Sequence, residues 1–218
     1  MRCRNHSHLP VLIISSISST IVDHLRLMRT TGLATVGYFY VDFRERAKQE
    51  ARGLLSSLLT QFSTQSDRFC HTLSSLYASH ERGLEQPSEN ALAQCLREML
   101  EDPNQAPVFI VVDALDECPN SEGLPTPREQ ALEIVKELVE LKLQHLHLCI
   151  TSRPEIDIRG VLDPLKRYSV SLHDEAGQIE DIARYVESVV LSDATMRDWP
   201  KEEKKLVIAT LAKDGGGM

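Results

Sequence analysis

The stretch that decides the fold is 108–117, VFIVVDALDE, in which five apolar residues run into three acids within five positions. A continuous apolar run of this length is typical of a strand buried on both faces, in a parallel sheet with helices on each side. Such a strand delivers Asp113 to its carboxyl-terminal tip, where open α/β sheets bind their ligands. A carboxylate at that edge can hold Mg²⁺, so we predict Asp113 as a metal ligand.

Two further acids follow Asp113 within one turn of the chain. Asp116 or Glu117 could orient or polarise an attacking water, which makes both candidate catalytic residues. A plainer interpretation is a buried strand that runs into a solvated acidic loop. A metal-dependent hydrolase or nuclease is another alternative, but a two-metal site needs carboxylates from other strands. Asp42, at the end of the run 35–43, is the candidate for that role, and capping a strand-to-helix turn is its simpler interpretation.

A second motif, TSRP at 151–154, closes the apolar run 146–151, LHLCIT. Neighbouring strands of a parallel sheet end at the same edge, so we expect Arg153 to lie near Asp113. A guanidinium is a planar, permanently charged fork that suits phosphate, and we predict Arg153 as a nucleotide-binding residue that reaches a γ-phosphate. The structural alternative is an exposed arginine ahead of a helix that begins at Pro154.

The remaining apolar patterns extend this sheet and add helices. The β-branched and aromatic run 35–43 and the more polar run 167–172 predict strands, and LPVLII at 9–14 predicts a buried strand or the remnant of one. Helical spacing of apolar residues predicts helices near 16–29, 46–64, 66–81, 88–101, 128–144, from 174 onward and at 200–212. Strands that alternate with helices predict an α/β fold, a three-layer sandwich with a mainly parallel sheet.

Composition places the chain among ordinary globular proteins. Its 218 residues are 42% hydrophobic and 26% charged, which argues against disorder, collagen and coiled-coil arrays. Residues 1–102 hold 11 basic and 11 acidic groups, whereas residues 103–218 hold 13 basic and 21 acidic groups. An acidic half without a Lys/Arg run argues against nucleic acid or an anionic membrane as partner, and would suit a basic protein.

The cysteines and the N-terminal segment bear on the compartment. Five cysteines, odd in number and never in CxxC spacing, predict reduced thiols and a cytoplasmic protein. Cys3, His6 and His8 offer zinc-type ligands, but no fourth ligand is obvious. The apolar run 9–14 is too short to cross a membrane. Basic residues precede it as in a signal peptide, yet an amphipathic pattern follows at once.

The two motifs together, FIVVDALDEC and LCITSRPE, resemble the Walker B and sensor-type motifs of NACHT-class STAND P-loop NTPases. Over residues 15–218, the order of elements is similar to the nephrocystin-type NACHT module of large fungal multidomain proteins. This resemblance implies an ASCE-type P-loop core that binds ATP or GTP with Mg²⁺ and acts as a nucleotide-controlled switch for signalling. The implied partners are other protein chains, attached repeat domains or further copies of the module.

The chain departs from that family where a Walker A loop, GxxxxGK[ST], should precede the first helix. Its first glycine is Gly32, beyond that helix. Matched to the family's GKS end, Ile14 takes the lysine position and Ser15 the hydroxyl position, so Ser15 is the residue of the loop still able to bind Mg²⁺. Loss of the phosphate cradle removes several charge-assisted hydrogen bonds of about 1.5–3 kcal/mol each, so we expect impaired nucleotide binding and no hydrolysis.

We therefore expect three segments. Residues 1–14 form an atypical N-terminus in place of the first strand and the Walker A loop, residues 15–173 form the α/β core, and residues 174–218 begin a helical subdomain. A fragment clipped at both ends explains this organisation more simply than two independent losses. The alternative is a degenerate module that serves as a catalytically dead protein-interaction scaffold.

Overall fold

A computed structural model describes residues 9–102, 105–121, 123–170, 178–192, 196 and 199–215, without the side chains of 9–16, 178–183 and 212–215. The chain divides into two compact units. One comprises residues 11–166, and the other comprises residues 1–10 with 167–218.

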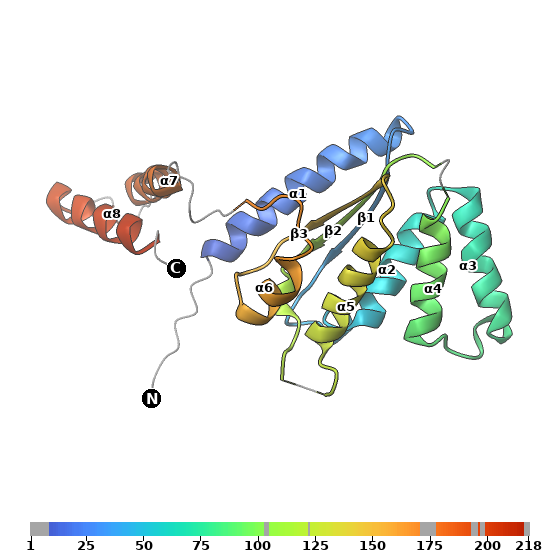
Figure 1. The fold of residues 1–218 in the computed structure, drawn as a ribbon. Coiled ribbons are helices and arrows are strands. Elements are labelled where there is room, and N and C mark those ends of the chain that lie inside the picture. The colour runs from blue at the N-terminus through green and yellow to red at the C-terminus, as the bar shows by residue number, and fades with distance from the viewer. Residues whose placement is uncertain are drawn as a thin grey trace. The chain divides into compact units, whose positions relative to one another are not determined.

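The centre of the first unit is a parallel sheet in the order β1–β2–β3 (Figure 1). Its strands are β1 (Thr35–Tyr40), β2 (Val108–Asp113) and β3 (Leu146–Ile150). Tyr40 lies opposite Asp113, and Val112 lies opposite Ile150, so the carboxyl ends of all three strands meet at one edge. The predicted α/β fold with a parallel sheet is confirmed.

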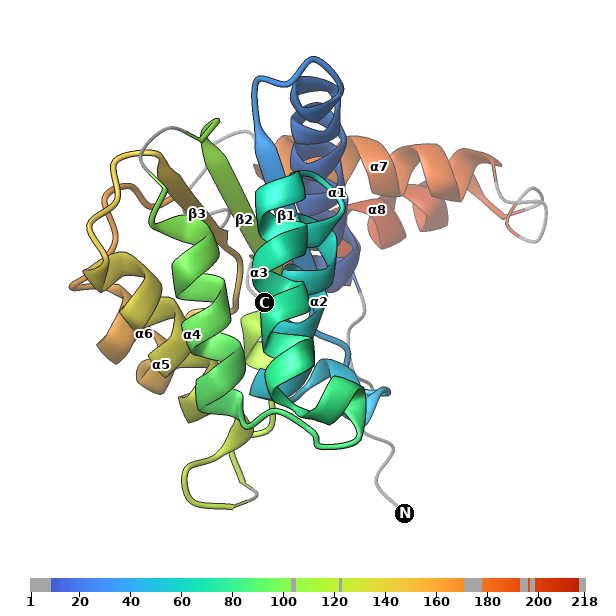
Figure 2. The ribbon, with the colours of Figure 1, turned by 90° about the vertical axis from the view of Figure 1, so that its right-hand side faces the viewer.

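Helices cover both faces of this sheet (Figures 1 and 2). They are α1 (Leu9–Thr30), α2 (Ala51–Ser63), α3 (Asp67–Ser79), α4 (Glu89–Leu100), α5 (Pro127–Glu140) and α6 (Ile156–Leu162). The described loops also contain the short 3₁₀ helices η1 (Arg46–Lys48), η2 (Glu81–Gly83) and η3 (Leu115–Glu117). α1 lies on one face, α2, α4 and α5 lie on the other, and α3 packs against α2 and α4.

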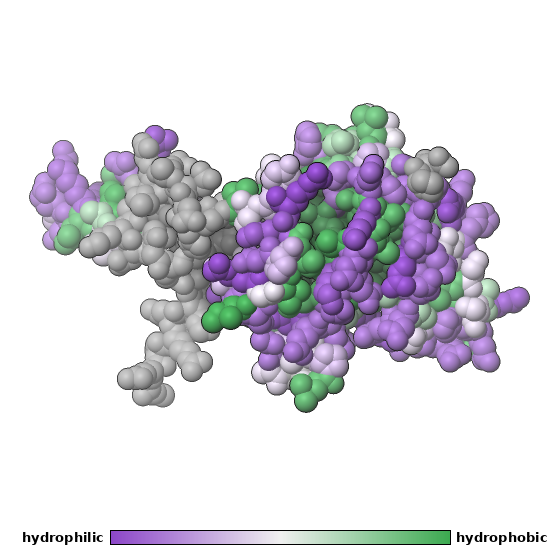
Figure 3. Space-filling view, in the orientation of Figure 1, coloured by the Kyte–Doolittle hydropathy of each residue, from purple (hydrophilic) through white to green (hydrophobic). Residues whose placement is uncertain are grey.

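Alternation along each strand produces two hydrophobic clusters, one on each face of the sheet. Val36 and Val111 pack with Val22 and Leu25 of α1. The opposite face joins the larger cluster, whose fully buried members include Leu55, Leu58, Phe62, Leu96, Met99 and Ile110. A Cβ atom at Gly37 would lie 2.8 Å from side-chain atoms of α2, so this glycine permits the close approach of α2 to β1. The outer sides of the helices are largely hydrophilic, and apolar residues are visible in the middle of the unit (Figure 3).

Two glutamines, Gln61 of α2 and Gln65 just after it, satisfy the free edge of β1. The backbone N–H of Val36 donates to Gln65 Oε1 at 2.9 Å, and Gln65 Nε2 donates to the Val36 carbonyl at 2.7 Å. Gln61 repeats the arrangement with Tyr38, at 3.0 and 2.8 Å. The side-chain amides thus take the place of a neighbouring strand and occupy an edge that would otherwise be open to another chain.

Two of the predicted strands are wrong. Residues 9–14 belong to α1, because the apolar run continues without a break into the amphipathic helix and Pro10 is tolerated in a first turn. Residues 167–170 form no strand, and 171–172 lie outside the described residues. A strand needs a neighbour for its backbone groups, and among the described residues β3 pairs with β2 alone. The helix expected at Pro154 begins at Ile156.

The second unit contains α7 (Gln178–Ser192) and α8 (Lys201–Gly215), in agreement with the helices predicted there. Val186 and Val190 are buried against Met196 and two apolar residues of α8. None of the described helices combines the length and the hydropathy that a membrane span requires.

Candidate functional site

The residues predicted for the site come together at the carboxyl-terminal edge of the sheet. Asp113 is the last residue of β2, Asp116 and Glu117 lie in η3, and Arg153 lies in the loop after β3. Ala114 adopts a left-handed conformation with φ of 58°, which non-glycine residues rarely adopt. This turn redirects the chain between Asp113 and the two acids that follow. The carboxylate of Asp113 therefore lies in a different environment from those of Asp116 and Glu117.

Asp113 is the buried centre of the site, with 2% of its surface exposed. Its Oδ1 accepts a hydrogen bond from Thr151 Oγ1 at 2.6 Å and another from Ser18 Oγ of α1. Thr151 Oγ1 in turn accepts from the backbone N–H of Ala114 at 3.0 Å. One carboxylate and two hydroxyls therefore join β2, β3 and α1 at a single point.

Ser18 was not among the predicted site residues. The predicted residue, Ser15, lies three positions earlier in α1, and its side chain is outside the described part of the structure, as is that of Ile14. A signal for Ser18 existed, because it precedes Val22 and Leu25 by four and seven residues and so lies on their buried helical face.

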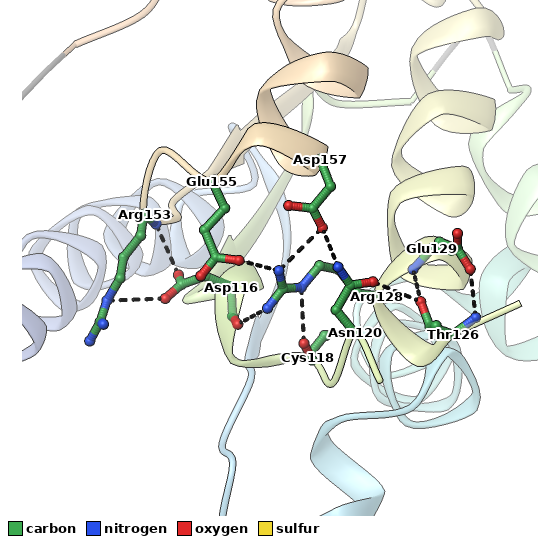
Figure 4. Close-up of polar contacts among 9 residues, drawn as sticks. All are labelled: Asp116, Cys118, Asn120, Thr126, Arg128, Glu129, Arg153, Glu155 and Asp157. Carbon is green, nitrogen blue, oxygen red and sulfur yellow. Dashed lines mark hydrogen bonds and ion pairs between the residues drawn. The ribbon is translucent and has the colours of Figure 1, made fainter. Parts of the chain in front are cut away.

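Asp116 and Arg153 pair with each other. Asp116 Oδ1 accepts from the backbone N–H of Arg153 at 3.0 Å, and its Oδ2 lies 3.3 Å from Arg153 Nε (Figure 4). The Asp116 side chain is 10% exposed and that of Arg153 is 55% exposed. The terminal nitrogens of the guanidinium point away from Asp116 in Figure 4, so Arg153 presents its outer end to solvent.

Glu117 faces the loop after β1. Its Oε2 accepts from the backbone N–H of Phe43 at 3.1 Å. Burial raises the pKa of Glu117, and the nearby Asp116 and Asp42 carboxylates raise it further, against the lowering effect of the Phe43 hydrogen bond and of Arg153. Half-buried and already bonded to a backbone donor, Glu117 connects η3 to the end of β1.

Asp42 is held by Arg44, two residues along the chain. Arg44 Nε and Nη2 each donate to the Asp42 carboxylate at 2.9 Å, and the backbone N–H of Arg44 donates at 2.9 Å. These bonds lower the pKa of Asp42 to about 2. This arrangement is that of a turn-capping carboxylate, the simpler of the two roles expected for Asp42.

Arg128, which sequence reasoning missed, fixes the loops around the site. It is 6% exposed in the first turn of α5. Its Nε donates to the Cys118 carbonyl at 3.0 Å and its Nη2 to the Asp116 carbonyl at 2.5 Å. Nη1 donates to Asp157 Oδ2 at 3.2 Å and also pairs with Glu155 (Figure 4). One buried guanidinium thus ties η3 to the loop after β3.

The start of α5 is itself fixed by a capping box. Glu129 N donates to Thr126 Oγ1 at 3.2 Å, and Thr126 N donates to Glu129 Oε2 at 2.7 Å. The cap determines where the helix begins and therefore which side Arg128 faces. The signal for its burial was the spacing to Ala131 and Val135, three and seven residues later on the buried face.

The residues fit a magnesium ion better than they fit a triphosphate. Asp113 with the hydroxyls of Ser18 and Thr151 supplies hard oxygen donors, and Mg²⁺ is commonly held by one or two carboxylates plus substrate phosphates. No group of three or more His, Cys, Asp or Glu residues in the described part of the chain could hold a metal by itself. Residues 9–30 are helical throughout, so backbone N–H groups beyond the first turn are bonded within α1 and cannot cradle phosphates.

The described cysteines do not add chemistry to the site. Cys70, Cys95, Cys118 and Cys149 are free thiols, and burial raises the pKa of Cys95 and of Cys118 to about 11. Such thiols are poor nucleophiles at neutral pH. The zinc ligands considered at Cys3, His6 and His8 lie outside the described residues.

Comparison with known proteins agrees with the order of these elements. Residues 15–153 match the family model described as "Nephrocystin 3, N-terminal". The match begins at Ser15, within α1, and ends at Arg153, so it includes the whole sheet and the site. Searches among curated proteins and among solved structures found no match.

Proposed function

The chain belongs to the nephrocystin 3 N-terminal family, and from this premise we propose that residues 11–166 form a nucleotide-responsive switch module of the NACHT/STAND type. Its ligands in this proposal are ATP or GTP with Mg²⁺, bound at the carboxyl-terminal edge of the sheet. Binding is weak in this chain, because α1 occupies the place where a phosphate cradle would be needed. Its output is a change in contacts with other protein chains.

The observation that carries the proposal is the pairing of Arg153 with Asp116 beside the buried Asp113 cluster. The Arg153 guanidinium is about half-exposed and contacts Asp116 through Nε, so Arg153 can exchange the Asp116 carboxylate for another anion. The backbone bond from Arg153 N to Asp116 stays in place during that exchange. Arg153 then has two states, one bonded to Asp116 and one bonded to a ligand phosphate, which is the requirement for a switch.

The other residues of the site have defined parts in this proposal. Asp113, with the hydroxyls of Ser18 and Thr151, would hold Mg²⁺, which neutralises phosphate charge when bound. Arg128 keeps η3 and the loop after β3 at a fixed separation. Because this separation is fixed, movement of Arg153 changes the contacts of these loops and does not loosen the rest of the sheet edge.

Calorimetric titration with Mg-ATP and with Mg-GTP tests the proposal. We expect millimolar affinity that requires Mg²⁺ and is lost in Arg153→Gln and in Asp113→Asn. Arg159→Gln, an exposed ion-paired arginine of α6, is the matched control and should bind like the unaltered protein. Micromolar binding would contradict the impairment, and binding that survives Arg153→Gln would contradict the role of Arg153.

A catalytically dead protein-interaction scaffold is the second candidate function. It is favoured by the state of the two candidate catalytic acids, because Asp116 and Glu117 each already accept a hydrogen bond from a backbone N–H. These bonds give both acids a structural role, which a scaffold requires. A phosphate-release assay with ATP and GTP distinguishes the candidates: the scaffold predicts no release above background, whereas release abolished by Glu117→Gln would restore Glu117 as a catalytic residue.

A further inference from the structure

A cleft lies at the opposite, amino-terminal end of the sheet, away from the site described above. It encloses about 510 Å³ between the end of α1, the start of β1, the α2–α3 connection and the chain before β2. This volume lies within the range of about 300–1,000 Å³ that is usual for small-molecule sites. Phe69, 2% exposed, provides an apolar part of its wall.

Two polar groups that line the cleft lack partners. Thr35 is 8% exposed, and its hydroxyl makes no hydrogen bond to another described residue. Gln105 Oε1 is the one buried side-chain N or O atom in the described residues without a hydrogen-bond partner. Buried polar groups in folded proteins are nearly always satisfied, so Gln105 Oε1 indicates a molecule that is to be bound here, and the Thr35 hydroxyl offers that molecule a further hydrogen bond.

The rest of the polar lining consists mainly of donors. The Arg29 side chain makes no ion pair or hydrogen bond with another described residue, and Arg68, whose side chain is 54% exposed, pairs with Asp102. Ser66 precedes the 13-residue helix α3 without making the usual capping bond, so its hydroxyl and the first N–H groups of that helix remain available. Cationic side chains beside free N–H groups and hydroxyls form the surroundings that an oxyanion requires.

We propose that this cleft binds a small phosphate monoester. Its phosphate group is bound by Arg29, Ser66 and the first turn of α3, and the Thr35 hydroxyl donates to it from the floor. Gln105 Oε1 accepts a hydrogen bond from a hydroxyl or amine of the ligand, and the carbon skeleton lies against Phe69. This site is separate from the switch site at the other end of the strands and does not depend on the function proposed for it.

Amide chemical shifts of the ¹⁵N-labelled chain, titrated at constant ionic strength, test the proposal. Two probes separate the possible sources of the oxyanion: inorganic phosphate and glycerol 3-phosphate. We expect saturable shifts near Arg29, Thr35 and Phe69 with both probes, and tighter binding of glycerol 3-phosphate, which also contacts Phe69. Equal affinity for the two probes would overturn the assignment of an organic ester and leave a simple phosphate site.

Two variants and one control locate the binding. Arg29→Gln and Thr35→Val should each weaken binding about tenfold, because each removes one hydrogen bond to a charged group. Valine keeps the shape of threonine, and Arg29 is exposed, so both variants should fold. Arg26→Gln, on the same helix but bonded to Tyr38, should bind normally. Absence of saturable shifts, affinity unchanged in both variants, or shifts confined to residues 151–153 would overturn the proposal.

Discussion

Among single residues, Asp113 shows which features of a site a local sequence pattern can predict and which it cannot. An apolar run that ends in an acid predicted its burial at the strand tip, because that depends only on neighbouring residues. The hydroxyls that bond to it come from positions 95 residues earlier and 38 residues later. Matching to a family motif indicates Ser15, whereas the helical spacing to Val22 and Leu25 places Ser18 on the buried face of α1.

Replacing Ser18 with alanine tests the hydroxyl–carboxylate cluster. Ser18 is fully buried, and its loss removes a hydrogen bond to a carboxylate worth about 1.5–3 kcal/mol, less about 0.5 kcal/mol gained in helix propensity. Urea unfolding should therefore show a loss of about 1–2.5 kcal/mol. Ser56→Ala, exposed on α2, is the control and should be neutral or slightly stabilising. Equal stability of the two variants would contradict the bond from Ser18 to Asp113.

Glu117 predicts a pH dependence of stability with a definite sign. Because burial raises its pKa in the folded protein above the ordinary value of 4.5, the folded state holds the proton more tightly than the unfolded state. Its contribution to stability is therefore present below that value and falls as pH rises through the raised pKa. Glu117→Gln keeps an oxygen for the Phe43 N–H but cannot ionise.

We expect Glu117→Gln to be more stable than the unaltered chain at pH 7 and to lose that advantage below about pH 4. Thermal unfolding of both proteins across this range measures the difference. Glu133→Gln, an exposed position on α5 paired with Lys136, should bring no such gain at neutral pH. An advantage of Glu117→Gln that is constant with pH would show that titration of Glu117 is not its cause.

Arg128 carries the largest predicted effect of a single side chain. Arg128→Met keeps the apolar stem but leaves the carbonyls of Asp116 and Cys118 without their donor and Glu155 without its cation. Breaking such a network should lower the free energy of unfolding by about 2–4 kcal/mol. Lys136→Met removes a half-exposed cation of the same helix, whose partner Glu133 is exposed, and should change stability by less than about 1 kcal/mol. If both variants unfold at the same denaturant concentration, the network does not stabilise the fold.

At the level of elements, long periodic helices and buried strands were predictable, and isolated short segments were not. α2, α4 and α5 have apolar residues at helical spacing over three or more turns, and β2 is apolar up to its last residue, Asp113. The segment 9–14 is compatible with either a strand or a helix, and the helix that follows it decides the outcome. The run 167–172 has a strand-like composition, but pairing depends on a neighbour that composition does not reveal.

The edge of β1 gives a prediction about an element. Gln61→Leu with Gln65→Leu removes the four side-chain bonds that satisfy this edge. At a net value of about 1 kcal/mol each, partly recovered by hydration, the loss should be about 1–3 kcal/mol. The freed edge should also promote self-association, seen by light scattering as concentration-dependent mass. Gln94→Leu, at an exposed position of α4, should remain monomeric if the unaltered chain does. If the double variant associates no more than this control, edge capping is contradicted.

For the molecule as a whole, the two units differ in how much core they possess. Both clusters on the sheet consist of residues between 21 and 162, whereas the helices α7 and α8 share a cluster of two buried valines and three partly buried residues. The division predicted from sequence, with a core up to residue 173, rested on counting a strand at 167–172. Core size, and not the order of elements, determines which part can be stable alone.

We therefore predict that a chain ending at Lys166 keeps the fold of the core unit. Its hydrophobic clusters are intact, so circular dichroism should show one cooperative thermal transition, with a free energy of unfolding within about 1 kcal/mol of that of the unaltered chain. An isolated peptide of residues 167–218 should be largely unstructured, because so small a cluster cannot offset the conformational entropy of two helices. A shortened chain without a cooperative transition would show that the helical pair supplies part of the core. A cooperatively folded 167–218 peptide would show instead that α7 and α8 form a domain in their own right.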